Sequence, residues 1–467
     1  MKTVLLSPVL FEVANKYFSN TGPNLEKDIA PSLKPYTEYL HNVNVSSSFF
    51  MRPASQSEIS NIIRDLDKGK ALGPNSIPIS ILKLNNDFFS NQLSKLVNLT
   101  FETGIFPDLY KLAQVIPVFK AGNENLCENY RPISLLPIYS KIYEKVMYSR
   151  IYEFLSQNNL IYNRQFGFRA NHSTNHSIIS LTEEIKSALD SGQLVAGVFL
   201  DLKKAFDTIN HNILIHKLQY YGFRGITSQL LLSYLSNRKQ FVYIDGCKSS
   251  LEDISCGIPQ GSTLGPLLFL MYINDLRFCL RNSKANHFAD DTCITYSNKK
   301  QALLEKGLNE DLISVTEWFK ANRLSLNVSK SKLLIFRSKR KKVDLNQISI
   351  KLSENILEPV QSVKYLGMLI NDNLSWDIHT NNLSKKLGRA NGIISKLRYY
   401  APMKTMLSVY YAIFHSQILY GCSSWALTTL KNSGKRNILQ KKCLKSANLE
   451  KYFSQISIYT LITSRID

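Results

Sequence analysis

An apolar run that ends on Asp201 constrains the fold more than any other feature of this sequence. Residues 195–200, VAGVFL, have the continuous apolar character of a strand buried on both faces. Asp201 follows directly, and a carboxylate at the edge of a core is costly unless it is paired or binds a cation. Asp201 is therefore expected to project from a sheet into a cleft. The alternative is a carboxylate that stabilises the start of a following helix.

The segment after Asp201 is predicted to be that helix. A second aspartate, Asp207, follows six residues later. Helical spacing of apolar residues over 205–218 is seen at Phe206, Ile209, Ile213 and Leu214.

The chain is strongly basic. It has 57 lysines and arginines against 36 acidic residues, which gives a formal charge of +21. A polyanion such as nucleic acid is the partner that this charge favours, and the alternative is a basic but inert surface. With 467 residues, 44% of them hydrophobic, the chain can bury a large core in two or three structural units.

Cysteine usage and the N-terminus indicate an intracellular protein. The seven cysteines form no CxxC pair and no Cys/His cluster, which argues against a disulfide framework or a zinc module and favours a reducing compartment. The apolar start MKTVLLSPVLF is interrupted by Pro8 and has no cleavage site or spanning length. We expect a protein of the nucleus or cytoplasm that is not secreted and has no membrane partner. The basic run RSKRKK, residues 337–342, is a nuclear-localisation signal, a solvated charged turn or a nucleic-acid contact.

The order of predicted elements favours an α+β fold. Residues 1–50 are polar and turn-rich without sustained periodicity, as in a linker. Apolar spacing predicts helices near 57–66, 88–103 and 138–156, and residues 114–137 predict a strand, a turn and a second strand. Strands and helices then mix without regular βαβ alternation. Residues 380–467 are helical in pattern, with 14 Lys/Arg against two acids, which suits a surface that follows a phosphate backbone.

A pair of adjacent aspartates forms a second carboxylate locus. Asp290 and Asp291 stand between two short β-prone runs in NHFADDTCITY, as at the tip of a hairpin. Adjacent like charges repel, so such a turn needs a cation or open water. Together with Asp201 it offers the hard oxygen ligands that a pair of Mg²⁺ ions requires. Taken alone, a pair of aspartates is more often a solvated turn.

A glycine-rich turn forms the third element. In SCGIPQGSTLGPLLFLMYINDL, residues 255–276, glycines surround a polar turn before an apolar helix. Such glycines let the backbone approach a ligand, and the start of the helix presents N–H groups to it. The alternative is a plain structural Gly/Pro turn.

In their order and spacing these elements resemble the reverse transcriptases of non-LTR (LINE-type) retrotransposons of the jockey and CR1 kind. Eleven motifs carry the resemblance over nearly the whole chain: YFSNTGPNL, KALGPNSIP, IPVFKAG, NYRPISLLP, QFGFRANHST, FLDLKKAFDTINH, YLSNRKQFV, GIPQGSTLGPLLF, FADD, LSLNVSKSK and VKYLG.

The resemblance implies a right-hand polymerase with fingers, a ferredoxin-like palm and a helical thumb. The expected ranges are a linker or N-terminal extension at 1–50, fingers with the start of the palm at 51–195, a reverse transcriptase domain at 101–370 with its palm core at 196–370, and a basic helical thumb at 371–467.

The resemblance also implies the catalytic residues. Asp201, Asp290 and Asp291 match the catalytic carboxylates and would hold two Mg²⁺ ions, or Mn²⁺ in their place, with the backbone carbonyl of Leu202. Phe206 matches the steric-gate position that excludes a 2′ hydroxyl and so selects deoxynucleotides, and the alternative is a residue of a helix core.

Five further residues match positions that contact the nucleotide or template. Lys120 and Arg131 would meet the triphosphate by charge-assisted contacts, or form structural salt bridges. Gln260 and Gly261 match the turn that positions template and nucleotide. Lys330 matches a lysine that protonates pyrophosphate, or is a solvated surface lysine. Residues in RANHST and SNRKQF could bind template RNA by stacking and phosphate contacts.

The implied function is RNA-directed DNA polymerisation, in which a primer 3′ hydroxyl on an RNA template is extended with dNTPs. The chain departs from the family pattern at Asn75 and Ser76, where an acid and a glycine are usual. No nuclease motif precedes the presumed linker, so a separate endonuclease is an expected partner and a truncated copy is a further interpretation. The alternatives are a group II intron-type or telomerase-like enzyme and a catalytically inactive nucleic-acid-binding remnant.

Overall fold

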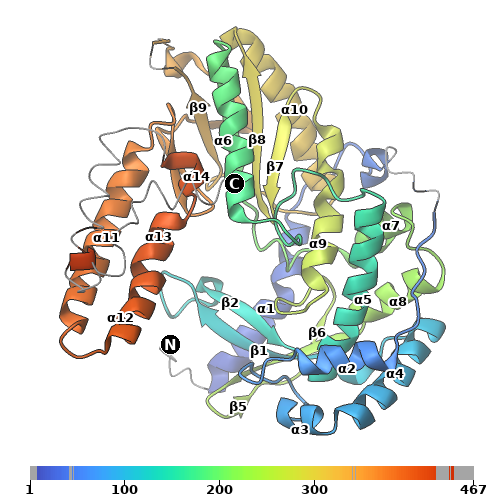
Figure 1. Cartoon of the computed structure of the whole chain (residues 1–467). Helices are drawn as coiled ribbons and strands as arrows, with labels where there is room; N and C mark the ends of the chain where they lie inside the picture. The colour runs from blue at the N-terminus through green and yellow to red at the C-terminus, as the bar shows by residue number, and fades with distance from the viewer. Residues whose placement is uncertain are drawn as a thin grey trace. The chain divides into compact units, whose positions relative to one another are not determined.

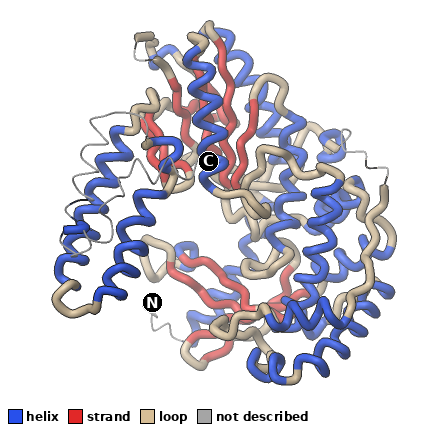
Figure 2. Tube along the Cα trace, in the orientation of Figure 1, coloured by secondary structure: helices blue, strands red, loops and turns tan. Residues whose placement is uncertain are grey.

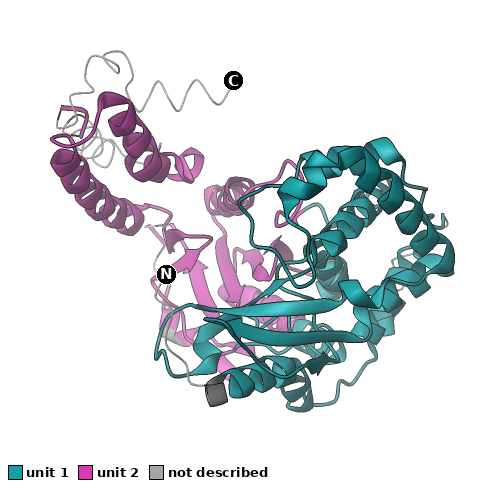
Figure 3. Ribbon diagram, turned by 90° about the horizontal axis from the view of Figure 1, so that it is seen from below, with its two compact units in different colours: residues 1–163, 202–281, 313–327 teal, residues 164–201, 282–312, 328–467 magenta. Residues whose placement is uncertain are grey.

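Two units, each built from separated segments of the chain, make up the computed structural model of this protein (Figure 3). The first unit contains residues 1–163, 202–281 and 313–327, and the second contains residues 164–201, 282–312 and 328–467. The structure describes residues 8–40, 45, 47–338, 340–341, 343–426, 441 and 443–445. Both units combine helices with sheet, so the predicted mixture of the two is confirmed (Figure 2). The predicted ranges for linker, fingers, palm and thumb stay predictions.

The first unit is built on a five-stranded sheet (Figure 1). Its strands are β1 (Leu112–Phe119), β2 (Tyr130–Leu135), β4 (Arg238–Ile244), β5 (Cys247–Lys248) and β6 (Glu252–Ile254). They run in the order β2-β1-β4-β5, and β6 pairs with β4. β1 pairs with β2 antiparallel and with β4 parallel. The strand, turn and strand predicted within 114–137 are therefore confirmed.

Helices surround this sheet. They are α1 (Pro8–Lys27), η1 (Tyr36–Tyr39), α2 (Gln56–Arg64), α3 (Ile79–Leu84), α4 (Asn86–Thr103), η2 (Asp108–Tyr110), η3 (Cys127–Asn129), α5 (Ile138–Gln157), α7 (His211–Tyr220), α8 (Ile226–Leu235), α9 (Gly265–Ile273) and η4 (Asn274–Cys279). The helices predicted near 57–66, 88–103 and 138–156 are confirmed as α2, α4 and α5.

The prediction that residues 1–50 lack periodic structure is wrong for residues 8–27, which form helix α1. Helix α1 packs against β4 and β6 and buries Phe11, Ala14 and Phe18 in a cluster with Val115 and Val242. The segment contains Asn, Ser, Thr, Gly and Pro residues, which are typical of turns, so its apolar stripe did not lead to the prediction of a helix. Tertiary packing of the stripe outweighs their weak helix propensity.

The helix predicted over 205–218 begins later than expected. Helix α7 starts at His211, and the Asn210 side chain caps it by accepting hydrogen bonds from the N–H groups of Asn212 and Ile213. Residues 206–210 lie outside the helix because their backbone is held by another segment. Ile258 N–H donates to the Phe206 carbonyl, and Gly257 N–H donates to the Ile209 carbonyl.

The second unit is built on an antiparallel sheet in the order β7-β8-β3-β9 (Figure 1). Its strands are β3 (Leu194–Leu200), β7 (Lys284–Phe288), β8 (Asp291–Asn298) and β9 (Lys332–Phe336). All seven residues of β3 are buried, and the strand pairs with β8 on one side and β9 on the other. The prediction of a strand buried on both faces before Asp201 is confirmed.

The remaining elements of this unit are two small hairpins and a set of helices. They are β10 (Ile350–Leu352), β11 (Asn355–Leu357), β12 (Ser362–Tyr365), β13 (Met368–Asn371), α6 (Thr174–Asp190), η5 (Leu345–Gln347), α11 (Asp377–Leu397), α12 (Met403–Val409), η6 (Tyr410–His415), α13 (Ser416–Leu419) and α14 (Cys422–Trp425). Helix α10 (Gln301–Ala321) continues from the second unit into the first.

The C-terminal helices confirm the helical pattern predicted from residue 380, within the described residues. They share an apolar core with β12 and β13 that includes Trp376, Leu387, Phe414 and Trp425. Residues 427–440, 442 and 446–467 of the predicted thumb lie outside the described residues, as do residues 1–7, 339 and 342 of the N-terminal and RSKRKK predictions.

All seven cysteines are free, in line with the expectation of no disulfide framework. Over the part of the chain that the structure describes, no helix combines the length and the apolar character needed to cross a bilayer.

Candidate functional site

The register of the second sheet places Asp201 beside the aspartate pair. Strand β3 pairs with β8 antiparallel, and the last pair in the register is Leu200 with Thr292. Asp201 and Asp291 are the next residues beyond this last pair, and the charge of Asp201 acts on the Asp291 carboxylate. The fold therefore draws together two carboxylates that lie 90 positions apart in the sequence.

Asp290 lies at the tip of the predicted hairpin, next to this pair. Strands β7 and β8 are antiparallel, and Phe288 pairs with Asp291, so Ala289 and Asp290 form a two-residue turn. Ala289 has a positive φ of 57°, a conformation that favours glycine. The buried Gln165 side-chain oxygen holds this turn by accepting hydrogen bonds from the N–H groups of Ala289 and Gly167, at 3.1 and 2.9 Å.

The three carboxylates share one electrostatic environment. Burial, together with the charges of Asp290 and Asp201, raises the pKa of Asp291 to about 6. Like charges that face each other across strands are destabilising. In the described parts of the chain, however, no three or more His, Cys, Asp or Glu residues are grouped closely enough to form a ready-made metal centre. The structure thus brings the carboxylates together without a compact preformed cage.

Asp201 and Asp291 line a cleft of about 500 Å³ whose other charged residues are lysines. Lys330, Lys332 and Lys364 line the same cleft, and all three are exposed. The Ser331 hydroxyl between two of these lysines accepts a hydrogen bond of 3.3 Å from the Asp201 N–H. The predicted residue Lys330 is therefore placed in the same cleft as two of the predicted carboxylates, within the second unit.

The first unit gathers basic side chains at its β1–β2 hairpin. Lys120 follows the end of β1, Arg131 lies on β2, and both are exposed. The Lys204 ammonium donates to the carbonyls of Glu128 and Tyr130 in the same hairpin, at 3.3 and 3.4 Å. Burial lowers the pKa of Lys204, and nearby Lys120 and Arg131 lower it further, against the effect of Asp207 and Glu128. Three cations thus meet at one edge of the first sheet.

The glycine-rich turn is fastened to the same hairpin. The Gln260 carbonyl accepts a hydrogen bond of 2.8 Å from Ser134 N–H on β2. Gly261 has a φ of 127°, and a Cβ atom there would lie 2.5 Å from the Ser134 carbonyl oxygen. Only glycine fits this close approach. The predicted residues Gln260 and Gly261 are therefore held against the strand that carries Arg131.

Phe206 packs beside this turn. Its ring stacks on Phe269 of α9 with centroids 4.6 Å apart and planes 18° apart. Its carbonyl accepts a hydrogen bond of 2.8 Å from Ile258 N–H of the turn. The residue as a whole is partly exposed.

The N–H groups at the start of α9 are not available to a ligand, contrary to the expectation from sequence. The buried Glu144 carboxylate accepts hydrogen bonds from Thr263 and Leu264 N–H, and Ser262 accepts from Gly265 N–H. A negative charge at a helix start is stabilising, and here a side chain of α5 provides it. The start of this helix is structural.

Leu202 begins the second segment of the first unit, whereas Asp201 ends the first segment of the second unit. Leu202 forms an isolated bridge with Leu326. Its predicted role as a backbone ligand to metal stays a prediction.

Sequence reasoning gave no role to three residues that organise these sites. Gln165 holds the Ala289–Asp290 turn, Lys204 joins the basic hairpin, and Asp207 accepts a hydrogen bond of 2.8 Å from the Gln260 side chain. All three lie inside motifs that were recognised, QFGFRANHST and FLDLKKAFDTINH, but nothing in their spacing shows their partners.

Comparison with protein families matches residues 118–370, more than half of the chain, to "Reverse transcriptase (RNA-dependent DNA polymerase)". This match and the relatives below confirm the resemblance to reverse transcriptases of non-LTR retrotransposons.

Three curated proteins of Drosophila melanogaster are similar to the chain. It is 28% identical over 405 residues to the probable RNA-directed DNA polymerase from transposon X-element, covering 84% of this chain and 43% of the relative. It is 27% identical over 403 residues to the RNA-directed DNA polymerase from mobile element jockey, covering 83% and 43%. It is 28% identical over 436 residues to the probable RNA-directed DNA polymerase from transposon BS, covering 88% and 46%. The chain therefore spans less than half the length of these relatives.

Proposed function

Because the chain belongs to the reverse transcriptase family, the RNA-dependent DNA polymerases, we propose that it is the polymerase of a non-LTR retrotransposon. In this proposal it extends the 3′ hydroxyl of a DNA primer along an RNA template and uses dNTPs as substrates. The three relatives described above are named RNA-directed DNA polymerases of mobile elements, which supports this reaction.

The observation that carries the proposal is the cleft that Asp201 and Asp291 line together. A fully buried strand leads into the first carboxylate, the second begins the strand paired with it, and Lys330 lines the same cleft. Repulsion between them costs stability, so a role in folding alone does not explain the arrangement. A role in binding a cation does explain it.

The carboxylates fit a divalent metal ion. They are hard oxygen donors, and burial and the charges of Asp290 and Asp201 raise the pKa of Asp291, a penalty on its ionised form that a cation would relieve. We assign Asp201, Asp290 and Asp291 as the groups that would hold two Mg²⁺ ions, for which Mn²⁺ can substitute. When bound, such ions activate a hydroxyl for attack and stabilise the charge that develops on a departing pyrophosphate.

Residues of this chain then bind and orient the reactants. Lys120, Arg131 and Lys204 offer three cations to a triphosphate, and contacts of this kind are short and strong. The ring of the partly exposed Phe206 would contact the sugar and exclude a 2′ hydroxyl. Lys330, exposed in the cleft of the carboxylates, would donate a proton to pyrophosphate.

The finer architecture follows from these roles. We assign the sheet β7-β8-β3-β9 to the palm, the β1–β2 hairpin to the fingers, and helices α11–α14 to the thumb of a right-hand polymerase.

Helix α11 and the turn after it supply a surface for nucleic acid. The exposed basic residues of this region are Lys385, Lys386, Arg389, Lys396, Arg398 and Lys404. Tyr399 and Tyr400 are 72% and 87% exposed, and the Arg398 guanidinium lies 4.6 Å from the centre of the Tyr399 ring. Cations that follow phosphates and open rings that stack on bases are the two components of single-strand binding. We propose that this surface holds the template or primer.

Primer extension tests the function. Purified protein is given poly(rA)/oligo(dT), Mg²⁺ and dTTP, beside Asp290→Ala and the matched control Asp253→Ala. Asp253 is an exposed aspartate paired with Lys239, outside the proposed site. We expect activity in the wild type and the control, and a loss of at least about a hundredfold in Asp290→Ala.

A non-catalytic RNA-binding remnant is the second candidate. It is favoured by the formal charge of +21, which suits nucleic-acid binding without turnover. Tight primer–template binding without extension, at any Mg²⁺ or Mn²⁺ concentration, would identify the remnant and refute the polymerase.

A further inference from the structure

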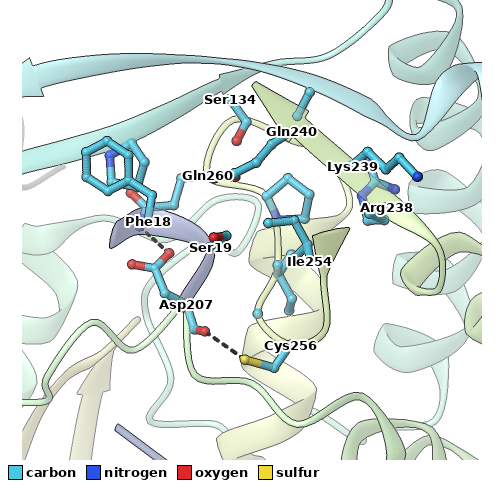
Figure 4. A pocket seen from close by; sticks show the side chains of 15 residues that line it. Phe18, Ser19, Ser134, Asp207, Arg238, Lys239, Gln240, Ile254, Cys256 and Gln260 are labelled. Carbon is cyan, nitrogen blue, oxygen red and sulfur yellow. Dashed lines mark hydrogen bonds between the residues drawn. The ribbon is translucent and has the colours of Figure 1, made fainter. Parts of the chain in front are cut away.

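Asp207 has no part in the function proposed above, yet it contacts a residue that does. Its carboxylate accepts a hydrogen bond of 2.8 Å from the side-chain nitrogen of Gln260. Figure 4 shows the two side chains facing each other at a small cavity of about 50 Å³. An ionised carboxylate only accepts hydrogen bonds, so it fixes which end of the amide faces it. The amide oxygen of Gln260 is thereby turned away from Asp207.

The backbone of Asp207 is held in place by two other segments of the chain. A Cβ atom at Gly22 or Gly257 would lie 2.1 or 2.8 Å from the Asp207 carbonyl oxygen, so two segments pack directly on it. The Cys256 thiol donates to the same oxygen at 3.4 Å (Figure 4). The backbone of Asp207 is therefore fixed by close packing within the first unit.

The backbone of Gln260 is fixed as well. Its carbonyl accepts from Ser134 N–H, and Gly261 packs against the Ser134 carbonyl. The remaining freedom of Gln260 lies in its side-chain torsions, and the hydrogen bond to Asp207 restricts them. Holding a side chain in one productive orientation reduces the cost of ordering it when a ligand binds.

We propose that Asp207 is a positioning residue that holds the Gln260 amide with its oxygen available as an acceptor for the incoming nucleotide. Asp207 itself does not touch the nucleotide. It acts through Gln260, so its contribution to nucleotide affinity depends on that side chain. This inference rests on the proposed function, in which Gln260 lies at the nucleotide site.

The test measures nucleotide binding without chemistry. A primer–template whose primer ends in a dideoxynucleotide is bound to the protein, and its dissociation rate is measured against the concentration of the next correct dNTP. We expect Asp207→Ala and Gln260→Ala each to weaken the apparent dNTP affinity about tenfold. Asp207→Asn keeps an oxygen acceptor for Gln260 and should stay within about twofold of wild type. The double variant should be no weaker than Gln260→Ala alone, because coupled residues are not additive.

A purely structural role predicts a different pattern. Asp207→Ala and Gln260→Ala would then add in the double variant, and Asp207→Asn would not restore affinity. Either result overturns the proposal. Asp253→Ala is the matched loss of an exposed carboxylate in the same unit and should behave as wild type. Thermal unfolding of each variant identifies any that lose nucleotide affinity only because they unfold.

Failure of the proposed function gives a separate result. A wild type that binds dNTP on the blocked primer yet extends no free primer contradicts the polymerase activity and leaves the positioning role supported. A wild type whose primer–template complex does not respond to dNTP at all overturns the positioning role.

Discussion

Replacing Asp291 with asparagine is expected to stabilise the metal-free protein at neutral pH, although the same change should abolish catalysis. Asp291 lines the same cleft as Asp201 and follows Asp290 in the chain. Burial and these two charges make its ionised form unfavourable in the folded state. Asparagine has nearly the same shape and no charge, so it removes the penalty and leaves the packing intact.

The sign and size follow from the pKa. The Asp291 pKa rises from its ordinary value of 3.8 to about 6 on folding. Below about pH 4 Asp291 is protonated in both the folded and the unfolded state, so it carries no penalty. Between about pH 4 and pH 6 it loses its proton first in the unfolded state, so the free energy of unfolding falls as the pH rises. One pKa unit corresponds to about 1.4 kcal/mol, which gives about 3 kcal/mol in full. Because the side chain is exposed, solvent screening reduces this to about 1 kcal/mol.

Urea unfolding in EDTA measures this effect at about pH 5 and about pH 8. The variant should exceed the wild type in free energy of unfolding by about 1 kcal/mol at the higher pH and by less at the lower pH. Added Mg²⁺ should then stabilise the wild type more than the variant, because a ligand that binds only the folded state stabilises it. A variant that is no more stable than wild type in EDTA, or a gap that does not change with pH, would refute the reasoning.

Substitutions at three further residues test other parts of the site. Phe206→Ala should raise the incorporation of ribonucleotides relative to deoxynucleotides about tenfold or more. Primer extension with single nucleotides measures this ratio. An unchanged ratio would show that the ring is only packed on Phe269. Gly261→Ala forces a Cβ atom to within 2.5 Å of the Ser134 carbonyl and should lower the free energy of unfolding by at least about 2 kcal/mol in urea. Glu144→Ala removes the acceptor of the Thr263 and Leu264 N–H groups and should cost about 2–3 kcal/mol in the same assay. Glu144→Gln keeps an oxygen acceptor and removes a buried charge, so it should stay within about 1 kcal/mol of wild type, and a cost equal to that of Glu144→Ala would show that the charge itself is needed.

Local patterns in the sequence predict much of the second unit correctly. A continuous apolar run gave β3, and two β-prone runs around adjacent aspartates gave the β7–β8 hairpin. Both signals are local, because strand burial and turn chemistry depend on near neighbours in the chain. The pairing of β3 with β8, which brings Asp201 and Asp291 into one cleft, is a long-range property, and no local pattern contains it.

The first unit shows where local patterns fail. Helix α1 has a turn-like composition and is stabilised by its contacts with β4 and β6. The segment after Lys204 has helical spacing but gives its backbone carbonyls to Gly257 and Ile258 instead of to helical neighbours. In both cases a partner distant in sequence outweighs local propensity, which is weak by comparison.

The position of Asp201 at the end of β3 also explains how a destabilising pair is retained. Seven consecutive buried residues, five of them paired with both β8 and β9, fix the register of β3, because a slip by one residue would turn every side chain to the opposite face. The penalty of about 1 kcal/mol at Asp291 is small against such a strand, since each buried aliphatic side chain contributes about 1.5–3 kcal/mol. A site of this kind therefore needs a strand much more apolar than folding alone would require. Weakening that strand, for example by Val198→Ala, should loosen the carboxylate pair and reduce the Mg²⁺-dependent stabilisation before it unfolds the sheet.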